Sequence, residues 1–201
     1  TGGAAVWSVC WEGREPALAL DLPGHGASAD PWGSWDAAIG RLLDALPSTV
    51  ARMVGYSLGG RIALGMLRAA PERFQAITLV SAHPGLSSPA ERAVRRAADR
   101  CWVDLLRRDG VPGFVCAWES LPLFAGQARL PAEALARQRT RRLSHRAEGL
   151  MASMKVFGLA EMPDIRNDLS RFPGKLCCIV GEDDPKFFHI ARKVMDIRPK
   201  L

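Results

Sequence analysis

The chain has 201 residues, 48% of them hydrophobic and 24% charged, which excludes a wholly disordered protein and provides enough apolar side chains for a buried core. No apolar run approaches the roughly 20 residues that a membrane-spanning helix needs, and the first residues lack the pattern of a secretory signal, so we expect a cytoplasmic protein. The net charge of +6 comes from residues 91–146, which contain twelve arginines and six acidic residues. No zinc-finger or aromatic RNA-binding pattern accompanies this charge, so no nucleic-acid partner is expected.

Short apolar runs, each followed by a turn with Gly or Pro, are typical of parallel strands that are covered on both faces. The chain has four such runs, at residues 17–20, 51–54, 76–80 and 176–180. Two helical patterns, Trp35–Leu46 and Leu58–Ala70, separate the first three runs. Alternation of strand and helix predicts an α/β fold with a mostly parallel sheet and right-handed crossovers.

The long segment between the third and fourth predicted strands has a different character. It reads as helices interrupted at Pro112, Pro122, Pro131 and Pro163, and no strand pattern is present in it. We therefore predict a first part of the α/β core at residues 1–86 and a helical cap at residues 87–170. The second part of the core, residues 171–201, is expected to be incomplete.

The pentapeptide Gly55-Tyr56-Ser57-Leu58-Gly59 fits the pattern G-x-S-x-G, and it lies between a predicted strand and a predicted helix. That context is typical of a nucleophile elbow, a sharp turn that presents the serine hydroxyl above the carboxyl ends of the strands. The two glycines are expected to leave room for the tight turn. The backbone N–H of Leu58 is predicted to donate to an oxyanion.

A serine nucleophile or base needs an imidazole and a carboxylate, which in elbow enzymes follow the serine along the chain. Gly181-Glu182-Asp183-Asp184 follows the fourth predicted strand, so Asp183 and Asp184 compete for the role of the acid. The single histidine after them is His189, within a helical pattern. No histidine occupies the expected place, and the second oxyanion donor would precede Trp7, so the chain looks truncated at both ends.

Several motifs together resemble one known family. They are DLPGHG (21–26), GYSLGGRIAL (55–64), HPGL (83–86), ER with DR-x-W (91–102), F-x-x-x-W with PLF (114–124), MPDIR-x-DL (162–169) and GEDDPKF (181–187). In this order they resemble the α/β-hydrolase superfamily. Within it, they resemble the lyases of menaquinone (vitamin K2) biosynthesis that form 2-succinyl-6-hydroxy-2,4-cyclohexadiene-1-carboxylate.

The resemblance implies roles for individual residues. Ser57 matches the triad serine, and the fourth position of G-E-x-D-x-K-F favours Asp184 over Asp183 as the triad acid. The positions that match contacts to the substrate are Tyr56, Arg61, Arg95, Trp118 and Arg142, the last a looser match. The family's catalytic histidine and its N-terminal His-Gly segment have no counterpart in this sequence.

The resemblance implies elimination of pyruvate from 2-succinyl-5-enolpyruvyl-6-hydroxy-3-cyclohexene-1-carboxylate, with no metal or organic cofactor. A small polycarboxylate would be the partner, and a monomer is favoured. Two other hypotheses remain open at this point. The same elbow could serve a serine hydrolase of esters, lactones or C–C diketones, or the chain could be an inactive truncated product or a relic that only binds the anion.

Overall fold

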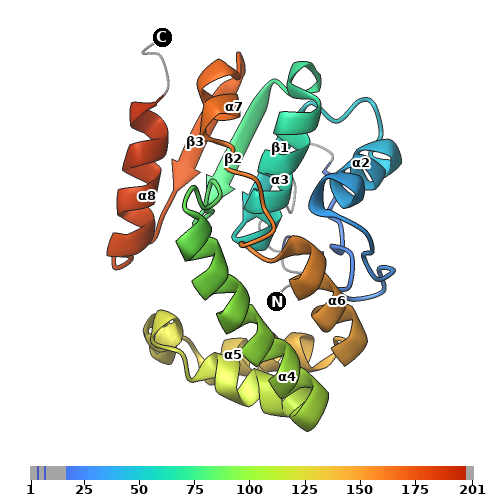
Figure 1. The fold of residues 1–201 in the computed structure, drawn as a ribbon. Helices are drawn as coiled ribbons and strands as arrows, with labels where there is room; N and C mark the ends of the chain where they lie inside the picture. Colours follow the sequence, from blue (N-terminus) through green and yellow to red (C-terminus); the bar gives the residue numbers. More distant parts are fainter. Residues whose placement is uncertain (1–3, 5–6, 8–16, 198–201) are drawn as a thin grey trace. The chain divides into compact units, whose positions relative to one another are not determined.

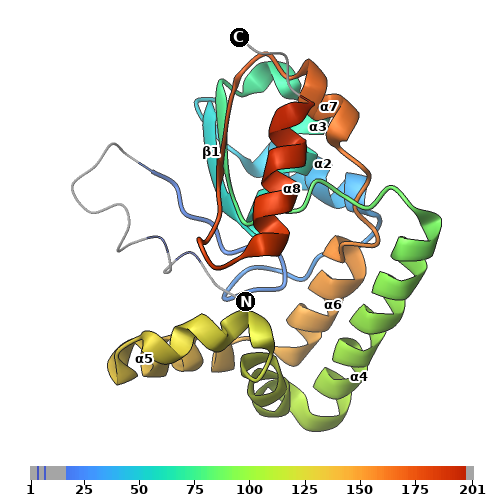
Figure 2. The same ribbon diagram turned by 90° about the vertical axis from the view of Figure 1, so that its left-hand side faces the viewer.

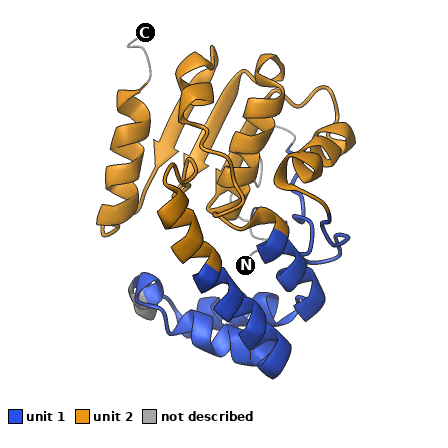
Figure 3. Cartoon of the chain, in the orientation of Figure 1, with its two compact units in different colours: residues 1–32, 97–155 blue, residues 33–96, 156–201 orange. Residues whose placement is uncertain are grey.

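The computed structural model of the protein describes residue 4, residue 7 and residues 17–197. The chain divides into two compact units (Figure 3). Unit 1 comprises residues 1–32 and 97–155, and unit 2 comprises residues 33–96 and 156–201. The first sixteen residues of the predicted core therefore lie almost entirely outside the described part. The proposed boundaries between core and cap stay a prediction.

Unit 2 is built on a parallel sheet of three strands in the order β1 (Arg52–Tyr56), β2 (Ala76–Val80) and β3 (Lys175–Ile179) (Figure 1). The strands are in register, so that the last residues of β1, β2 and β3 are direct neighbours. All three strands therefore end at the same edge of the sheet. The residues that follow them are brought together there, which is where an α/β protein places its site.

The helices of unit 2 follow the predicted pattern. They are α2 (Trp35–Ala45), α3 (Leu58–Ala69), the 3-10 helix η1 (Pro71–Arg73), α7 (Arg166–Arg171) and α8 (Pro185–Asp196). The hydroxyl of Ser34 accepts from the N–H of Ala37 at 3.3 Å and so fixes the start of α2. Figure 2 shows α2, α3, α7 and α8 on one side of the sheet. Apolar residues of α3 such as Leu64 and Leu67 are fully buried there.

The structure corrects two expectations about the strands. Val54, Tyr56 and Ile179 are 39%, 53% and 50% exposed, so the described sheet is covered on one face and not on both. Side chains alternate between the faces of a strand, and the described helices of this unit pack on one face only. Residues 17–20 form no strand, and Leu18 is 56% exposed. An apolar run indicates a tendency to be buried, but a strand also needs a neighbour for its backbone hydrogen bonds.

Unit 1 contains residues 97–155, the larger part of the predicted helical segment 87–170. Its helices are most of α4 (Pro89–Glu119), the 3-10 helix η2 (Pro122–Arg129), α5 (Ala132–Leu143) and most of α6 (Ala147–Phe157). Gly110, with φ 62° and ψ −168°, breaks α4 two residues before Pro112, as the sequence predicted. Leu106, Phe114 and Leu150 form the buried core of this unit. No helix in the described part of the chain is long and apolar enough to cross a membrane.

Candidate active site

Ser57 lies at the corner between β1 and α3, as the motif predicted. Its backbone has φ 51° and ψ −108°, a strained combination for a residue with a Cβ atom. The N–H of Ser57 donates to the carbonyl of Val80 at 2.9 Å, and its carbonyl accepts from the N–H of Arg61 at 3.0 Å. These two bonds hold the corner between β2 and the first turn of α3. The side chain of Ser57 is exposed, so the hydroxyl is open to a ligand.

The close approach of strand and helix depends on Gly55 and Gly60. A Cβ atom on Gly55 would lie 2.5 Å from the carbonyl carbon of Gly59 and from the nitrogen of Gly60. A Cβ atom on Gly60 would lie 2.5 Å from that of Ala82. A Cβ atom on Gly59 would meet nothing within 4 Å among the described residues, so the expectation that Gly59 relieves crowding is wrong. The packing faces of α3, which the motif does not reveal, decide which glycine is required.

Leu58 and Tyr56 flank the serine. Leu58 is the first residue of α3, so its N–H has no carbonyl within the helix to which it can donate. The positive end of the helix dipole adds to the attraction of that N–H for an anion. Tyr56 ends β1 and is 53% exposed. The two residues predicted to line the elbow thus lie on either side of Ser57 in the chain.

Asp184 lies at the same edge of the sheet, in the turn after β3. It caps α8, because its Oδ1 accepts from the N–H of Phe187 at 3.0 Å. The strands β1 and β3 flank β2, and neighbouring strands are about 4.8 Å apart, so the ends of β1 and β3 are about 10 Å apart. One imidazole ring between Ser57 and Asp184 would span much of such a distance. The strand order therefore places Ser57 and Asp184 after the two strands that flank β2.

Two of the predicted arginines belong to unit 2. Nη1 of Arg61 donates to the carbonyl of Phe157 at 2.6 Å, which orients the guanidinium on the first turn of α3. Arg95 is in the first part of α4, which Arg92 attaches to the unit by donating to the carbonyls of Ala160 and Met162, both at 2.8 Å. Both arginines therefore have fixed backbones within the unit that holds Ser57.

Trp118 and Arg142 belong to unit 1, where each has partners of its own. Trp118 stacks on Phe114, with ring centroids 5.4 Å apart, and also contacts Phe124. Arg142 is 11% exposed, and its Nη1 donates to Glu119 at 2.9 Å. Its Nη2 lies within hydrogen-bond distance of two glutamine side chains, and its guanidinium packs over Phe124. Both side chains therefore contribute to the packing of this unit.

His83 opens the HPGL motif and follows β2. The pKa of His83 is lowered to about 4, mainly by burial and then by the positive charges of Arg166, Lys186, Arg61 and Arg95. His83 is therefore a neutral imidazole at neutral pH. The four cations come from α7, α8, α3 and α4, which the sequence alone does not bring together.

The remaining histidines lie elsewhere. His25 and His145 are buried in unit 1 with ring centroids 5.2 Å apart, and burial lowers the pKa of His25 to about 4. His189 is on α8, as its helical pattern predicted, and its side chain is exposed. No hydrogen bond from a described histidine reaches Ser57 or Asp184 in the chain as it stands. The triad imidazole therefore has no candidate in the described part.

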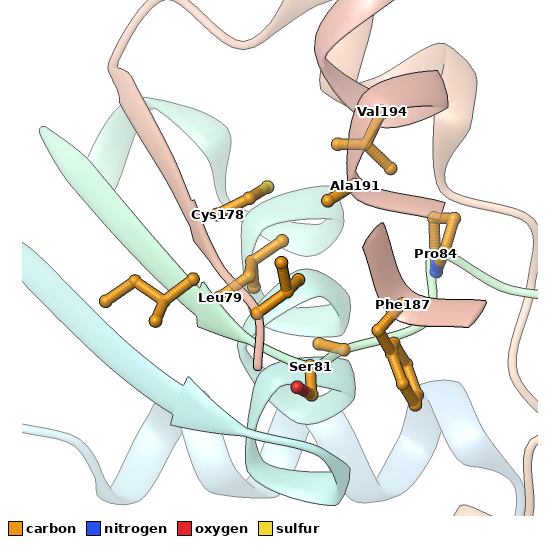
Figure 4. A pocket seen from close by; sticks show the side chains of 10 residues that line it. Leu79, Ser81, Pro84, Cys178, Phe187, Ala191 and Val194 are labelled. Carbon is orange, nitrogen blue, oxygen red and sulfur yellow. The ribbon is translucent and has the colours of Figure 1, made fainter. Parts of the chain in front are cut away.

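A small apolar pocket lies between the ends of β2 and β3 and the inner face of α8 (Figure 4). Ser81, Phe187, Ala191 and Val194 are among its lining residues, and Ser81 has a left-handed φ of 45°. Its apolar lining offers no set of metal ligands. Among all residues that the structure describes, no three His, Cys, Asp or Glu side chains are grouped so as to hold a metal ion.

The sequence pattern of the alpha/beta hydrolase fold family matches residues 17–191, which include the elbow, the parallel sheet and the helical segment between β2 and β3. The chain belongs to the α/β-hydrolase fold family. This confirms the predicted fold class.

Within that family, the chain is similar to proteins named 2-succinyl-6-hydroxy-2,4-cyclohexadiene-1-carboxylate synthase. One from Bacillus subtilis (strain 168) is 32% identical over 99% of this chain and 76% of the relative. One from Klebsiella pneumoniae (strain 342) is 34% identical over 88% of this chain and 71% of the relative.

The chain is also similar to solved structures. MenH from S. aureus has a TM-score of 0.91 and 28% identity, over 98% of this chain and 78% of that one. An esterase from Thermogutta terrifontis has a TM-score of 0.73 at 22% identity, over 98% of this chain and 74% of that one. The second likeness concerns the fold alone.

Proposed function

We propose that the protein eliminates pyruvate from 2-succinyl-5-enolpyruvyl-6-hydroxy-3-cyclohexene-1-carboxylate and releases 2-succinyl-6-hydroxy-2,4-cyclohexadiene-1-carboxylate. The observation that carries the proposal is the strained, exposed Ser57 at the strand-to-helix corner. Relatives at 32% and 34% identity with the synthase name support the choice of this reaction within the family. We also propose that the enzyme acts in the cytoplasm, and a monomer stays a prediction.

In this mechanism Ser57 acts as a base on a ring proton and not as an acylating nucleophile. The proton at C2 of the ring passes to Ser57, and the electron pair it leaves forms an enolate on the succinyl carbonyl. As this enolate collapses, a C2–C3 double bond forms, the existing C3–C4 double bond shifts to C4–C5, and the C5–O bond breaks. Pyruvate departs as its enolate and takes up a proton. The backbone N–H of Leu58 stabilises the enolate oxygen that develops on the substrate. Ser57 itself needs an imidazole held by a carboxylate, and Asp184 is the proposed acid.

The arginines bind the carboxylates of the substrate. Arg61 lies one helical turn from Ser57, and Arg95 lies one turn beyond the residue that anchors α4. Charge-assisted hydrogen bonds from these guanidiniums would hold the ring over the serine and recover orientation entropy. Tyr56, Trp118 and Arg142 are proposed as further contacts to the substrate.

The test measures release of pyruvate from the enolpyruvyl substrate. A dehydrogenase that consumes pyruvate reports this release in a coupled assay. We expect turnover with the full-length protein and none with its Ser57→Ala variant, while binding of the substrate is retained. Cleavage of p-nitrophenyl esters without release of pyruvate would instead support a serine hydrolase. Binding of the anion with neither reaction would support a relic, and undiminished turnover by Ser57→Ala would refute the role of the serine.

A further inference from the structure

The segment that follows β2 begins next to Ser57. It brings His83 to the same edge of the sheet. The carbonyl of Val80 accepts from the N–H of Ser57 at 2.9 Å. Two residues later, Ala82 packs so closely on Gly60 that a Cβ atom there would lie 2.5 Å away. The residues just before His83 therefore pack against Ser57 and the first turn of α3, which fixes the backbone position of His83.

The imidazole of His83 has a defined orientation and a defined tautomer. Its Nδ1 accepts from the N–H of Gly85 at 3.1 Å. Gly85 has φ +103°, and a Cβ atom on it would lie 2.2 Å from the carbonyl oxygen of Pro163, so this tight turn requires a glycine. Because Nδ1 is an acceptor, the hydrogen of the neutral ring is on Nε2, which is the donor that remains.

The same turn places Arg166 next to His83. The carbonyl of Pro84 accepts from the N–H of Ile165 at 2.8 Å, and Arg166 is the next residue along the chain. Asp164 accepts from Nη1 of Arg166 at 2.7 Å, and in the described part of the chain no other hydrogen bond of that guanidinium is formed. Most of its N–H groups therefore remain for a further acceptor.

The electrostatic environment of His83 favours an anion. The charges that act on it most strongly belong to Arg166, Lys186, Arg61 and Arg95, and all of them are positive. A neutral N–H donor surrounded by cations is stabilised when a carboxylate binds to it, whereas protonation of the ring is opposed by the same charges. Burial in the first place, and these four charges after it, lower the pKa of His83 to about 4.

We infer that His83 and Arg166 form a carboxylate-binding subsite beside Ser57, in which Nε2–H of His83 and the guanidinium of Arg166 donate to one carboxylate of the substrate. Lys186 adds positive charge to this subsite. The inference rests on the proposed function for the identity of the anion. It adds donors for one carboxylate of the substrate to those proposed on Arg61 and Arg95.

The inference is tested with His83→Leu, His83→Gln and Arg166→Gln, and with Arg107→Gln as the control. Arg107 is a matched exposed arginine that pairs with Asp104 in unit 1, away from any role proposed here. KM and kcat for pyruvate release are measured together with Kd for the cyclohexadiene product by calorimetry. Loss of one charge-assisted hydrogen bond corresponds to about a tenfold to hundredfold effect.

We expect His83→Leu and Arg166→Gln to raise both KM and Kd by about tenfold or more, with kcat changed little. His83→Gln keeps an N–H donor near the position of Nε2, so its constants should stay close to those of the unmodified protein, as should those of Arg107→Gln. A thermal melt of each variant checks that it is folded.

Unchanged KM and Kd in His83→Leu and Arg166→Gln, with pyruvate release intact, would overturn the subsite and leave the proposed function standing. Equal losses in His83→Gln and His83→Leu, together with a lower Tm, would show that the ring only packs and would also overturn it. If the unmodified protein neither releases pyruvate nor binds the product, the proposed function itself fails, and the subsite fails with it.

Discussion

Gly55→Ala and Gly59→Ala, two substitutions in the same pentapeptide, are expected to have opposite effects on stability. At position 55 the new methyl carbon would lie 2.5 Å, 2.5 Å and 2.6 Å from three backbone atoms of α3. Ordinary contacts to a Cβ atom are 3.4 Å or longer, so the overlap is close to 1 Å. Backbone atoms cannot rotate away as a side chain can, so the helix as a whole must move.

The magnitudes follow from the two environments. Overpacking of this kind costs about 3 kcal/mol, because the elbow has to open to admit the methyl group. At position 59, inside α3, the methyl group meets no described atom within 4 Å. Replacing a helical glycine by alanine there stabilises the helix by about 1 kcal/mol.

The assay is thermal unfolding followed by circular dichroism. For a chain of this length, about 1 kcal/mol corresponds to about 2–4 °C in Tm. Gly55→Ala should therefore lower Tm by about 6–12 °C, and Gly59→Ala should raise it by about 2–4 °C. Equal Tm values for the two variants, or a more stable Gly55→Ala, would refute the assignment of the tight contact to Gly55.

Ser57→Gly should raise the free energy of unfolding by about 1 kcal/mol, because glycine adopts φ 51° without strain, and it should abolish turnover. Ser57→Ala keeps the Cβ atom, so it should lose turnover without the rise in Tm. Stability should fall as the pH is lowered from 6.5 to about 4, because buried His25 binds a proton less readily in the folded than in the unfolded chain. With a folded pKa of about 4, His25 contributes about 3 kcal/mol to this loss. A urea titration of His25→Gln should therefore show a smaller loss, which comes from His83 and His145, because burial lowers the pKa of these two residues as well. Arg92→Gln should cost about 2–3 kcal/mol, since the buried carbonyls of Ala160 and Met162 lose their donor. Arg108→Gln should leave the urea midpoint nearly unchanged, because Arg108 pairs with Asp109 in contact with solvent; similar urea midpoints for the two variants would contradict this.

Local signals in the sequence located the elbow and most of the elements around it. The pattern at residues 55–59, between an apolar run and an amphipathic helix, predicted a corner that the structure contains at Ser57. The acid turn after the last strand was likewise found, with Asp184 as the cap of α8. These features depend on residues that are close along the chain, so a single sequence contains the information about them.

Contacts between distant segments decided the rest. The run at residues 17–20 is apolar enough for a strand, yet it forms none, because a strand needs a neighbour that the run itself does not specify. Trp118 and Arg142 matched positions that contact substrate, and the fold gives both of them partners within unit 1.

His83 is a further residue whose environment the sequence alone does not predict. The sequence presents it as an ordinary loop residue, and only the fold brings α3, α4, α7 and α8 close enough for their cations to act on it. Periodicity and short motifs report the local conformation of the backbone. The electrostatic potential at a side chain depends instead on every charge that folding brings near it, and those charges are scattered along the chain.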